Sequence, residues 1–343
     1  MAVVYRAESR RPETYGHIVA LKRLLPANEF DVDFDTVRSF IEEARLATRF
    51  KHQNIARTYA LGKADGSYFI EMEYVAGPTL TDVADQTETA GAMPIAIVGQ
   101  ILMQLCDALQ HVHELRDNEG KPLGLVHRDV SMSNAIVSQD GVVKLIDFGI
   151  VKGHSVQAMT EAGVLKGKLS YMAPEYLTGV LDKRADLFAL GVIAHELLTG
   201  HRLFYSSNDL ETLMRVRTMR VPPPSRLRSD VPAALDAIVM RALARDPDER
   251  WQTASELRAA LEDLYGPVEP NQVAEWLGWA FQREAPLPMS QVIRAIDELE
   301  QEPPPPPPAP VVALPPPSVL PLFVLSAMSL LLAILLFSLY AVA

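Results

Sequence analysis

The sequence predicts an α+β protein, because β-type runs and helical patterns follow one another along the chain. Ile18–Lys22 and Tyr68–Val75 are short β-type apolar runs, whereas Phe40–Phe50 and Ile95–Leu115 carry apolar residues at helical spacing. A further β-type region, Ala135–Ile146, is divided by a turn. The 343 residues fit about two domains, and the 48% of hydrophobic residues suffice for large cores.

Net charge and cysteine content narrow the function classes. A net charge of -11 argues against a nucleic-acid-binding surface, which would be basic. The single cysteine, Cys106, excludes an internal disulfide and indicates a reducing, cytoplasmic location for the folded part. Because Cys106 lies in an apolar helical run, we expect a buried hydrophobic side chain rather than a redox centre. The first residues, Met1–Arg11, lack the apolar segment of a secretory signal.

The divided β-type region is flanked by polar residues suited to phosphate chemistry. Its two halves are separated by Asp140-Gly141, a strong hairpin-turn signal. A hairpin here would hold Asp129 and Asn134, which precede it, around the same point as Asp147, which follows it. Phosphoryl transfer needs a carboxylate to accept the hydroxyl proton and oxygen ligands to hold Mg²⁺ on the phosphates.

Two motifs contain these residues. His127-Arg128-Asp129 with Asn134 matches H-R-D-x-x-x-x-N, and Asp147-Phe148-Gly149 is a D-F-G tripeptide. Either tripeptide by itself is weak evidence, but the set at this distance is specific. It resembles the catalytic core of a protein kinase of the bacterial Hanks-type (eukaryotic-like) serine/threonine class, and the resemblance covers roughly residues 1–264. It implies a bilobal protein-kinase fold, with a small β-rich N-lobe (1–75), a large α-helical C-lobe (76–265) and ATP in the cleft.

The resemblance assigns roles to five residues in the cleft. Asp129 would be the catalytic base, and Asn134 and Asp147 would bind Mg²⁺, or Mn²⁺ in its place. Lys22 would contact the α- and β-phosphates of ATP. Glu43 would pair with Lys22 from a helix. Each charge could by itself be an ordinary solvated side chain, but their joint order along the chain favours the ion pair.

The adenine site is expected around Met72-Glu73-Tyr74-Val75, which looks like the gatekeeper and hinge. There the backbone of Glu73 and Val75 would hydrogen-bond adenine. The apolar side chains that would sandwich the ring are Val4, Ala20, Met72 and Ile136. Ordinary core packing explains these apolar residues equally well, because a nucleotide pocket is itself an apolar cleft.

The glycine-rich phosphate loop has no full counterpart. In the family pattern G-x-G-x-x-G-x-V, Ala2 falls on the third glycine and Val4 on the valine. Three explanations are open: a start that lies upstream, loss of the first strand, or phosphates held without the loop. We expect the upstream start. The missing loop leaves one alternative function, a pseudokinase scaffold or nucleotide-binding module without phosphotransfer, which the intact cleft residues oppose.

Two positions depart from the serine/threonine kinase pattern. Ser131 stands where a lysine usually follows the catalytic aspartate, and Lys168 stands where a threonine usually precedes Tyr171. Our hypothesis is that Lys168 supplies the missing ammonium group near the transferring phosphoryl group. The alternative is a solvated loop lysine. A tyrosine kinase is disfavoured, because residues 131–133 lack the Ala/Arg pattern typical of that class.

Further residues are expected to regulate or support the site. Thr160 is the expected activation-loop phosphosite, and Arg128 would bind its phosphate through charge-assisted hydrogen bonds. By resemblance, Glu175 and Arg250 form a buried ion pair of the C-lobe. Asp186 would tether the backbone of the catalytic loop.

The C-terminal part is expected to form an extension, a spacer and an anchor. Residues 266–302 form a helical extension, with an amphipathic helix over Val273–Phe281 packed on the large lobe and a second helix around Ile293–Leu299. The proline-rich stretch 303–318 predicts a stiff polyproline II spacer. Val319–Ala343 has 25 residues without a charge, and about 20 apolar residues suffice for a transmembrane helix.

Taken together, these features predict a single-pass, tail-anchored serine/threonine kinase of the cytoplasmic membrane, with its kinase domain in the cytoplasm. Its substrates would be serine and threonine hydroxyls of proteins, with ATP as the phosphoryl donor. Autophosphorylation in trans within a homodimer is a further expectation. The composition predicts no nucleic-acid partner.

Overall fold

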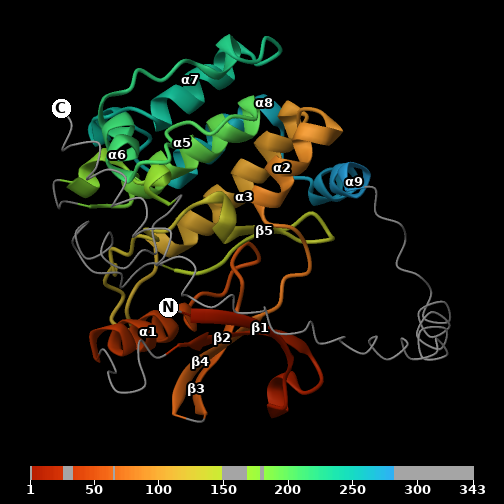
Figure 1. The fold of residues 1–343 in the computed structure, drawn as a ribbon, viewed down its shortest axis with the longest axis vertical. Helices are drawn as coiled ribbons and strands as arrows, with labels where there is room; N and C mark the ends of the chain where they lie inside the picture. The colour runs from red at the N-terminus through yellow and green to blue at the C-terminus, as the bar shows by residue number, and fades with distance from the viewer. Residues whose placement is uncertain (1, 26–33, 65, 149–167, 178–180, 282–343) are drawn as a thin grey trace, which may run out of the picture. The chain divides into compact units, whose positions relative to one another are not determined.

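The computed structural model describes residues 2–25, 34–64, 66–148, 168–177 and 181–281, and residues 1–283 form one compact unit. The small lobe is built on an antiparallel sheet of four strands in the order β1-β2-β4-β3 (Figure 1). The strands are β1 (Ala2–Glu8), β2 (Ile18–Leu24), β3 (Thr58–Ala64) and β4 (Ser67–Glu73). Helix α1 (Phe34–Ala47) packs on this sheet.

The register of the sheet decides which residues share the face that packs on α1. Lys22 pairs with Val4 on β1 and with Ile70 on β4, and Ala20 pairs with Met72. Because directly opposed residues point to the same side and side chains alternate along a strand, these five lie on one face. On that face Ile70 packs with Phe40 and Ala44 of α1, so α1 begins earlier than Phe40 but uses the expected apolar stripe.

The large lobe is helical. Its helices are α2 (Leu80–Ala90), α3 (Ile95–His113), α5 (Arg184–Thr199), α6 (Asp209–Thr218), α7 (Ala233–Ala242), α8 (Ala254–Tyr265) and α9 (Pro270–Ala280). α3 and α5 form its centre, since every residue of α5 from Ala185 to Leu198 and most residues of α3 are buried. α2 begins with a capping box between Thr79 and Asp82, and α5 ends at Gly200, whose φ of 72° suits a glycine.

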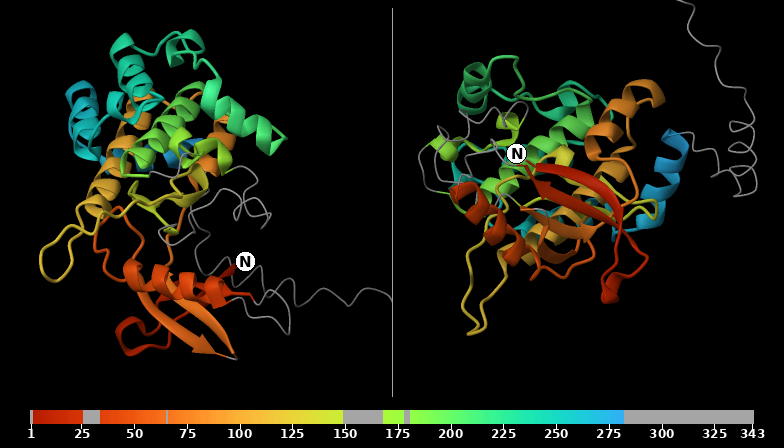
Figure 2. Two further views of the ribbon diagram at one scale, coloured as in Figure 1. Left: turned by 90° about the vertical axis from the view of Figure 1, so that its left-hand side faces the viewer. Right: turned by 60° about the horizontal axis from the view of Figure 1, so that its bottom comes forward.

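The predicted hairpin lies between the sheet and the large helices, as Figures 1 and 2 show. Its strands are β5 (Ala135–Val137) and β6 (Val143–Leu145). The turn depends on Gly141, which has a φ of 74°, a backbone conformation that costs glycine little. The hairpin therefore forms where Asp140-Gly141 predicts it.

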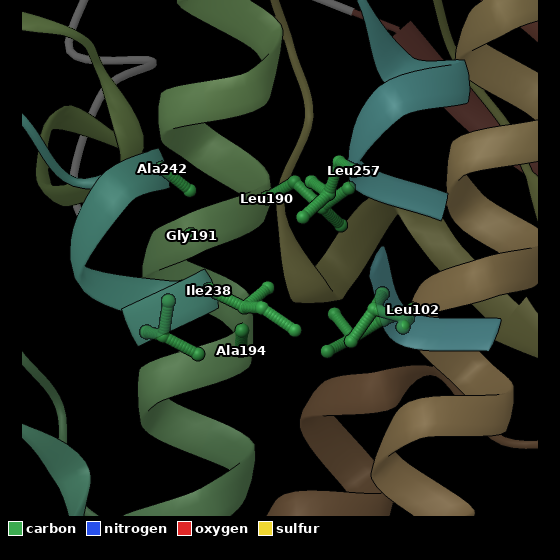
Figure 3. A pocket seen from close by; sticks show the side chains of 9 residues that line it. Leu102, Leu190, Gly191, Ala194, Ile238, Ala242 and Leu257 are labelled. Carbon is green, nitrogen blue, oxygen red and sulfur yellow. The ribbon is translucent and has the colours of Figure 1, made fainter. Parts of the chain in front are cut away.

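A small apolar cavity lies inside the large lobe between α3, α5, α7 and α8 (Figure 3). Its lining residues are Leu102, Leu190, Gly191, Ala194, Ile238, Val239, Ala242, Leu257 and Leu261. Gly191 lets α5 approach α7 closely, because a Cβ there would lie 2.9 Å from the Cβ of Ala242. With no polar lining group, the cavity is an imperfection of core packing.

α3 is the one helix in the described part of the chain that is long and apolar enough to cross a membrane. It is a core helix here, since 72% of its apolar 18-residue stretch is buried within the fold. The helix expected over Val273–Phe281 is α9, which packs on α2 and α3. The expected helix around Ile293–Leu299, the spacer 303–318 and the membrane span Val319–Ala343 lie outside the described residues.

Candidate active site

Lys22 lies at the centre of a three-residue charge cluster. Its Nζ is 3.0 Å from Oε1 of Glu43 on α1 and 2.9 Å from Oδ1 of Asp147, just after the hairpin. Burial would lower the pKa of Lys22, but the attraction of Asp147 and Glu43 outweighs burial and raises the pKa above its ordinary value. Lys22 is therefore held as a cation between two carboxylates.

Asp129 is bound by a lysine that lies far from it in sequence. The Nζ of Lys168 is 2.7 Å from Oδ2 of Asp129, whose side chain is 8% exposed. Ser131 is buried, and its Oγ is 3.1 Å from Oγ of Ser133. The ammonium group beside the predicted base therefore comes from Lys168, at the position where the sequence departs from the family pattern.

Asn134 and Asp147 flank the hairpin. The Nδ2 of Asn134 donates to the carbonyl of Asp129 at 2.8 Å, so its side-chain oxygen is the atom suited to a metal. Asp147 has a φ of 51° and Arg128 a φ of 66°, and within the described residues they alone among non-glycines have positive φ. Such strained backbone, at about 1–3 kcal/mol each, gathers at functional sites.

The oxygen donors fit Mg²⁺. A carboxylate from Asp147 and an amide oxygen from Asn134 are the hard ligands that Mg²⁺ takes, usually together with phosphate oxygens and water. No cluster of three or more His, Cys, Asp or Glu residues suited to a metal occurs in the described part of the chain. Asn134 and Asp147 alone would leave the remaining positions of an octahedral Mg²⁺ to phosphate oxygens and water.

A buried carboxylate on α5 anchors the loop that contains Asp129. Asp186 accepts hydrogen bonds from the backbone N–H groups of His127 (2.8 Å) and Arg128 (2.9 Å). Its Oδ2 also lies 2.8 Å from Nε2 of His113. Burial would raise the pKa of Asp186, but the hydrogen bond and charge of His113, with those of His127, lower the pKa overall. Asp186 is thus kept as a carboxylate anion that ties the loop to α5.

Aromatic packing fixes the residue after Asp147. The ring of Phe148 stacks on Phe50 at 4.4 Å and lies 4.6 Å from the ring of His127. His127 is fully buried, and its Nδ1 accepts the backbone N–H of Asp129 at 3.3 Å. These contacts join the segment after the hairpin to the loop before it. They therefore fix the positions of Asp147 and Asp129 relative to each other.

A buried ion pair supports the large lobe. The two terminal nitrogens of Arg250 lie 2.6 and 2.7 Å from the two carboxylate oxygens of Glu175. Arg250 is fully buried and also donates to three backbone carbonyls. This bidentate geometry is the strong form of a charge-assisted hydrogen bond.

This geometry agrees with comparisons to known proteins. A model of the protein kinase domain matches residues 1–261. The chain belongs to the protein kinase family. Its likeness to bacterial serine/threonine kinases confirms the Hanks-type resemblance: it is 33% identical to serine/threonine-protein kinase PknB of Mycolicibacterium smegmatis over 239 residues, which cover 68% of this chain and 36% of PknB.

Two other relatives bear on function. The kinase is 40% identical over 267 residues to tyrosine-protein kinase MasK of Myxococcus xanthus, covering 76% of this chain and 41% of MasK. It is 30% identical over 275 residues to serine/threonine-protein kinase PrkC of Bacillus subtilis, covering 79% of this chain and 40% of PrkC. The chain thus spans about two fifths of the length of these curated relatives.

A solved structure shows the same fold. The PknI kinase domain of Mycobacterium tuberculosis superposes with a TM-score of 0.57 at 29% identity, covering 77% of this chain and 90% of the PknI domain. The predicted kinase fold, with a β-sheet small lobe and a helical large lobe, is therefore confirmed.

The structure brings most of the predicted site residues of this kinase together around the hairpin. Ile136 lies on β5 and is bridged to Thr79 at the start of α2, next to the expected hinge. Val75 is buried, whereas Val4 is 55% exposed at the free edge of β1. The Glu73 side chain contacts Lys144 at 3.1 Å. The roles of these four in adenine binding stay predictions, and Thr160 lies outside the described residues.

Sequence reasoning missed several supporting residues of this kinase. Tyr176 donates its hydroxyl to the carbonyl of Arg128 at 3.1 Å, and His113 binds Asp186. Gln104 of α3 is bonded to the hairpin. A signal was present for two of them, because Gln104 and His113 are polar residues within the long apolar run that forms α3.

Proposed function

We propose that the chain is a serine/threonine protein kinase that transfers the γ-phosphoryl group of ATP to hydroxyls of proteins. The observation that carries the proposal is the convergence of Lys22, Glu43 and Asp147 on one point beside Asp129 and Asn134. A scaffold without phosphotransfer has no chemical need for all five groups. Phosphoryl transfer needs each, because its catalysis is mainly positioning and charge stabilisation.

Each residue has a part in the proposed reaction. Asp129 accepts the proton of the attacking hydroxyl, and Lys22, held by Glu43, binds the α- and β-phosphates of ATP. Asn134 and Asp147 would hold Mg²⁺, which supplies neutralisation of phosphate charge. The tether from Asp186 keeps the base in place without taking part in the chemistry.

Autophosphorylation is the first test. The full chain in detergent is incubated with Mg²⁺ and labelled ATP, and the Asp147→Ala chain serves as the control. We expect label in the parent chain and none in the variant. Label in neither chain, under conditions where both bind nucleotide, would favour the pseudokinase scaffold and reject the proposed activity.

Lys168 is proposed as the cation beside the transferring phosphoryl group. Its contact with Asp129 at 2.7 Å supports this role, since that aspartate lies next to the reacting hydroxyl. Lys168→Met is expected to lower kcat about 10²–10³-fold, the range typical of a lost charge-stabilising donor. The matched control is Lys121→Met, an exposed loop lysine. If Lys168→Met leaves phosphotransfer intact while Lys22→Met abolishes it, Lys168 has no such role.

Tyrosine is a second candidate for the residue type whose hydroxyl receives the phosphoryl group. The relative with 40% identity is named a tyrosine-protein kinase, and Ser131 departs from the usual serine/threonine pattern. We favour serine and threonine, which the names of PknB and PrkC support. Phosphoamino-acid analysis of the autophosphorylated chain distinguishes the two, and phosphotyrosine as the main product would favour the second.

Regulation by phosphate on Thr160 is proposed. Arg128 supports it, because its Nε is buried and has no hydrogen-bond partner among the described residues. A phosphate would bring about -1.5 to -2 charges and strong acceptor oxygens to this guanidinium. Mass spectrometry of the active chain should find phosphate on Thr160, and active protein that lacks it would contradict the proposal.

Membrane anchoring through Val319–Ala343 and trans-autophosphorylation in a homodimer are proposed from the sequence. For the anchor, the full chain should resist carbonate extraction from membranes, and release into the soluble fraction would reject it. For the dimer, an active chain should label an Asp147→Ala chain of different size in the same mixture. A labelled active chain beside an unlabelled variant would indicate that the reaction stays within one molecule.

A further inference from the structure

Helix α9 lies beyond the part of the chain that matches the kinase family model, which ends at residue 261. It is nevertheless built into the fold. Val273, Trp276, Leu277 and Ala280 are buried on its inner face, and α9 contacts both α2 and α3. At its end the carbonyl of Ala280 accepts a hydrogen bond from Nε2 of Gln86 on α2 at 2.9 Å.

The start of α9 lies against the turn of the β5–β6 hairpin. A Cβ built on Gly141 would lie 1.9 Å from the carbonyl oxygen of Pro270 and 2.7 Å from the backbone nitrogen of Ala274. Backbone atoms of a helix cannot move aside as a flexible side chain can. The turn and the first residues of α9 therefore fix each other's positions, and they can do so only because residue 141 has no side chain.

Two buried glutamines on one face of α3 join the same two elements. Gln100 donates to the carbonyl of Pro267 at 3.1 Å and accepts the N–H of Glu269 at 2.7 Å, just before α9. One turn later, Gln104 donates to the carbonyl of Gly141 at 3.1 Å and accepts the N–H of Val143 at 2.9 Å. Both glutamine side chains are 2% exposed. The bonds of Gln104 are buried and those of Gln100 are partly buried, and a buried group that loses its partner is costly.

We propose that α9 is a positioning element of the metal site, acting through Gly141 on the hairpin that carries Asn134 and Asp147. The proposal rests on the proposed kinase function of that hairpin. Each strand of the hairpin has three residues, so a displaced turn shifts both ends. Close-packed elements transmit such shifts rather than absorb them.

The experiment compares two glycines with the same backbone strain. Gly141→Ala adds a methyl group against α9, whereas Gly120→Ala, with a φ of 83°, adds it where nothing lies within 4 Å. For each full-length chain, Mn²⁺ affinity is measured with a non-hydrolysable ATP analogue, and analogue affinity is measured without metal. Gly141→Ala should weaken Mn²⁺ binding about 10-fold or more, as loss of a ligand-orienting contact does, and should weaken metal-free analogue binding much less. Gly120→Ala should change neither.

A second pair of variants covers the case in which Gly141→Ala fails to fold. Gln100→Leu removes the bonds that hold the start of α9, and Asn271→Leu changes an exposed asparagine on α9 itself. Weaker Mn²⁺ binding in Gln100→Leu and not in Asn271→Leu supports the proposal. Equal Mn²⁺ affinity in all folded chains overturns it, as does a parallel loss of metal-free analogue binding or a parent chain that does not bind Mn²⁺.

The readout separates this proposal from the proposed function. Mn²⁺ binding is measured without phosphotransfer. A parent chain that binds Mn²⁺ with the analogue but does not phosphorylate would reject the kinase function. In that case the glycine comparison would still decide whether α9 positions the metal ligands.

Discussion

Replacing Glu175 by glutamine should destabilise the fold by about 3–5 kcal/mol, the usual cost of leaving one partner of a buried ion pair without the other. The magnitude follows from the surroundings of Arg250. Its side chain is fully buried, its other hydrogen bonds go to backbone carbonyl oxygens, and its guanidinium carbon lies 5.0 Å from the centre of the Phe188 ring. In Glu175→Gln the shape is preserved, but the guanidinium loses the carboxylate that it binds directly, and an amide N–H₂ can face it.

Thermal unfolding of the full chain provides the assay. At about 2–4 °C per kcal/mol for domains of this size class, the melting temperature should fall by roughly 6–20 °C. The matched control is Asp248→Asn, which breaks the contact of Arg184 with a carboxylate that is 84% exposed, and such surface pairs contribute about 0–1 kcal/mol. The Glu175 effect should persist in high salt, because buried pairs are weakly screened.

A loss below about 1 kcal/mol for Glu175→Gln, or one that disappears in high salt, would refute the reasoning, since either result describes a surface ion pair. It would mean that Arg250 is held by its carbonyl contacts. Arg250→Met then becomes the informative variant, because it removes those contacts together with the charge.

Three further predictions follow from the packing and the buried titratable groups. Gly191→Ala should destabilise the large lobe by about 1–3 kcal/mol through overpacking against α7. Gly278→Ala, with no atom within 4 Å of the new Cβ, should not destabilise it. Chemical denaturation measures the free energy of unfolding of both variants. Burial lowers the pKa of His52 and of its stacked neighbour His111 from the usual 6.5. The unfolded chain therefore takes up protons at a higher pH than the folded chain, and the free energy of unfolding should fall as the pH drops below about 6.5. A melting temperature that stays constant from pH 7.5 to pH 5.5 would contradict this. Burial also raises the pKa of the Cys106 thiol well above its ordinary value, so iodoacetamide should modify it only in denaturant, and modification of the native chain would disprove its burial.

The sequence predicted a set of catalytic residues because they are close along the chain or belong to specific motifs, and their catalytic roles stay predictions. Asp129, Asn134 and Asp147 flank one hairpin whose turn is encoded by Asp140-Gly141. Lys168 was chosen because an unexpected cation appeared where Ser131 left one missing, and its contact with Asp129 agrees with that reasoning. The role that we assign to this contact still depends on the Lys168→Met experiment.

The supporting contacts could not be predicted, because they depend on tertiary packing that a single sequence does not encode locally. Gln100 and Gln104 were visible as polar residues in an apolar run, which indicates burial but does not name a partner. Gly141 was recognised for its turn conformation. Its close contact with Pro270, more than a hundred residues away, has no local signature.

The anchoring of the catalytic loop on α5 has a consequence for the order in which the molecule opens. Backbone amides exchange with solvent through local openings, and these are rarest in the best-buried elements. Because Asp186 holds the loop to a helix that is buried on all sides, the amides of His127 and Arg128 should exchange as slowly as those of α5. Lys22 and Glu43 depend on a small sheet and one helix. Mild denaturant should therefore abolish the proposed nucleotide binding before it disturbs the loop that carries the proposed base.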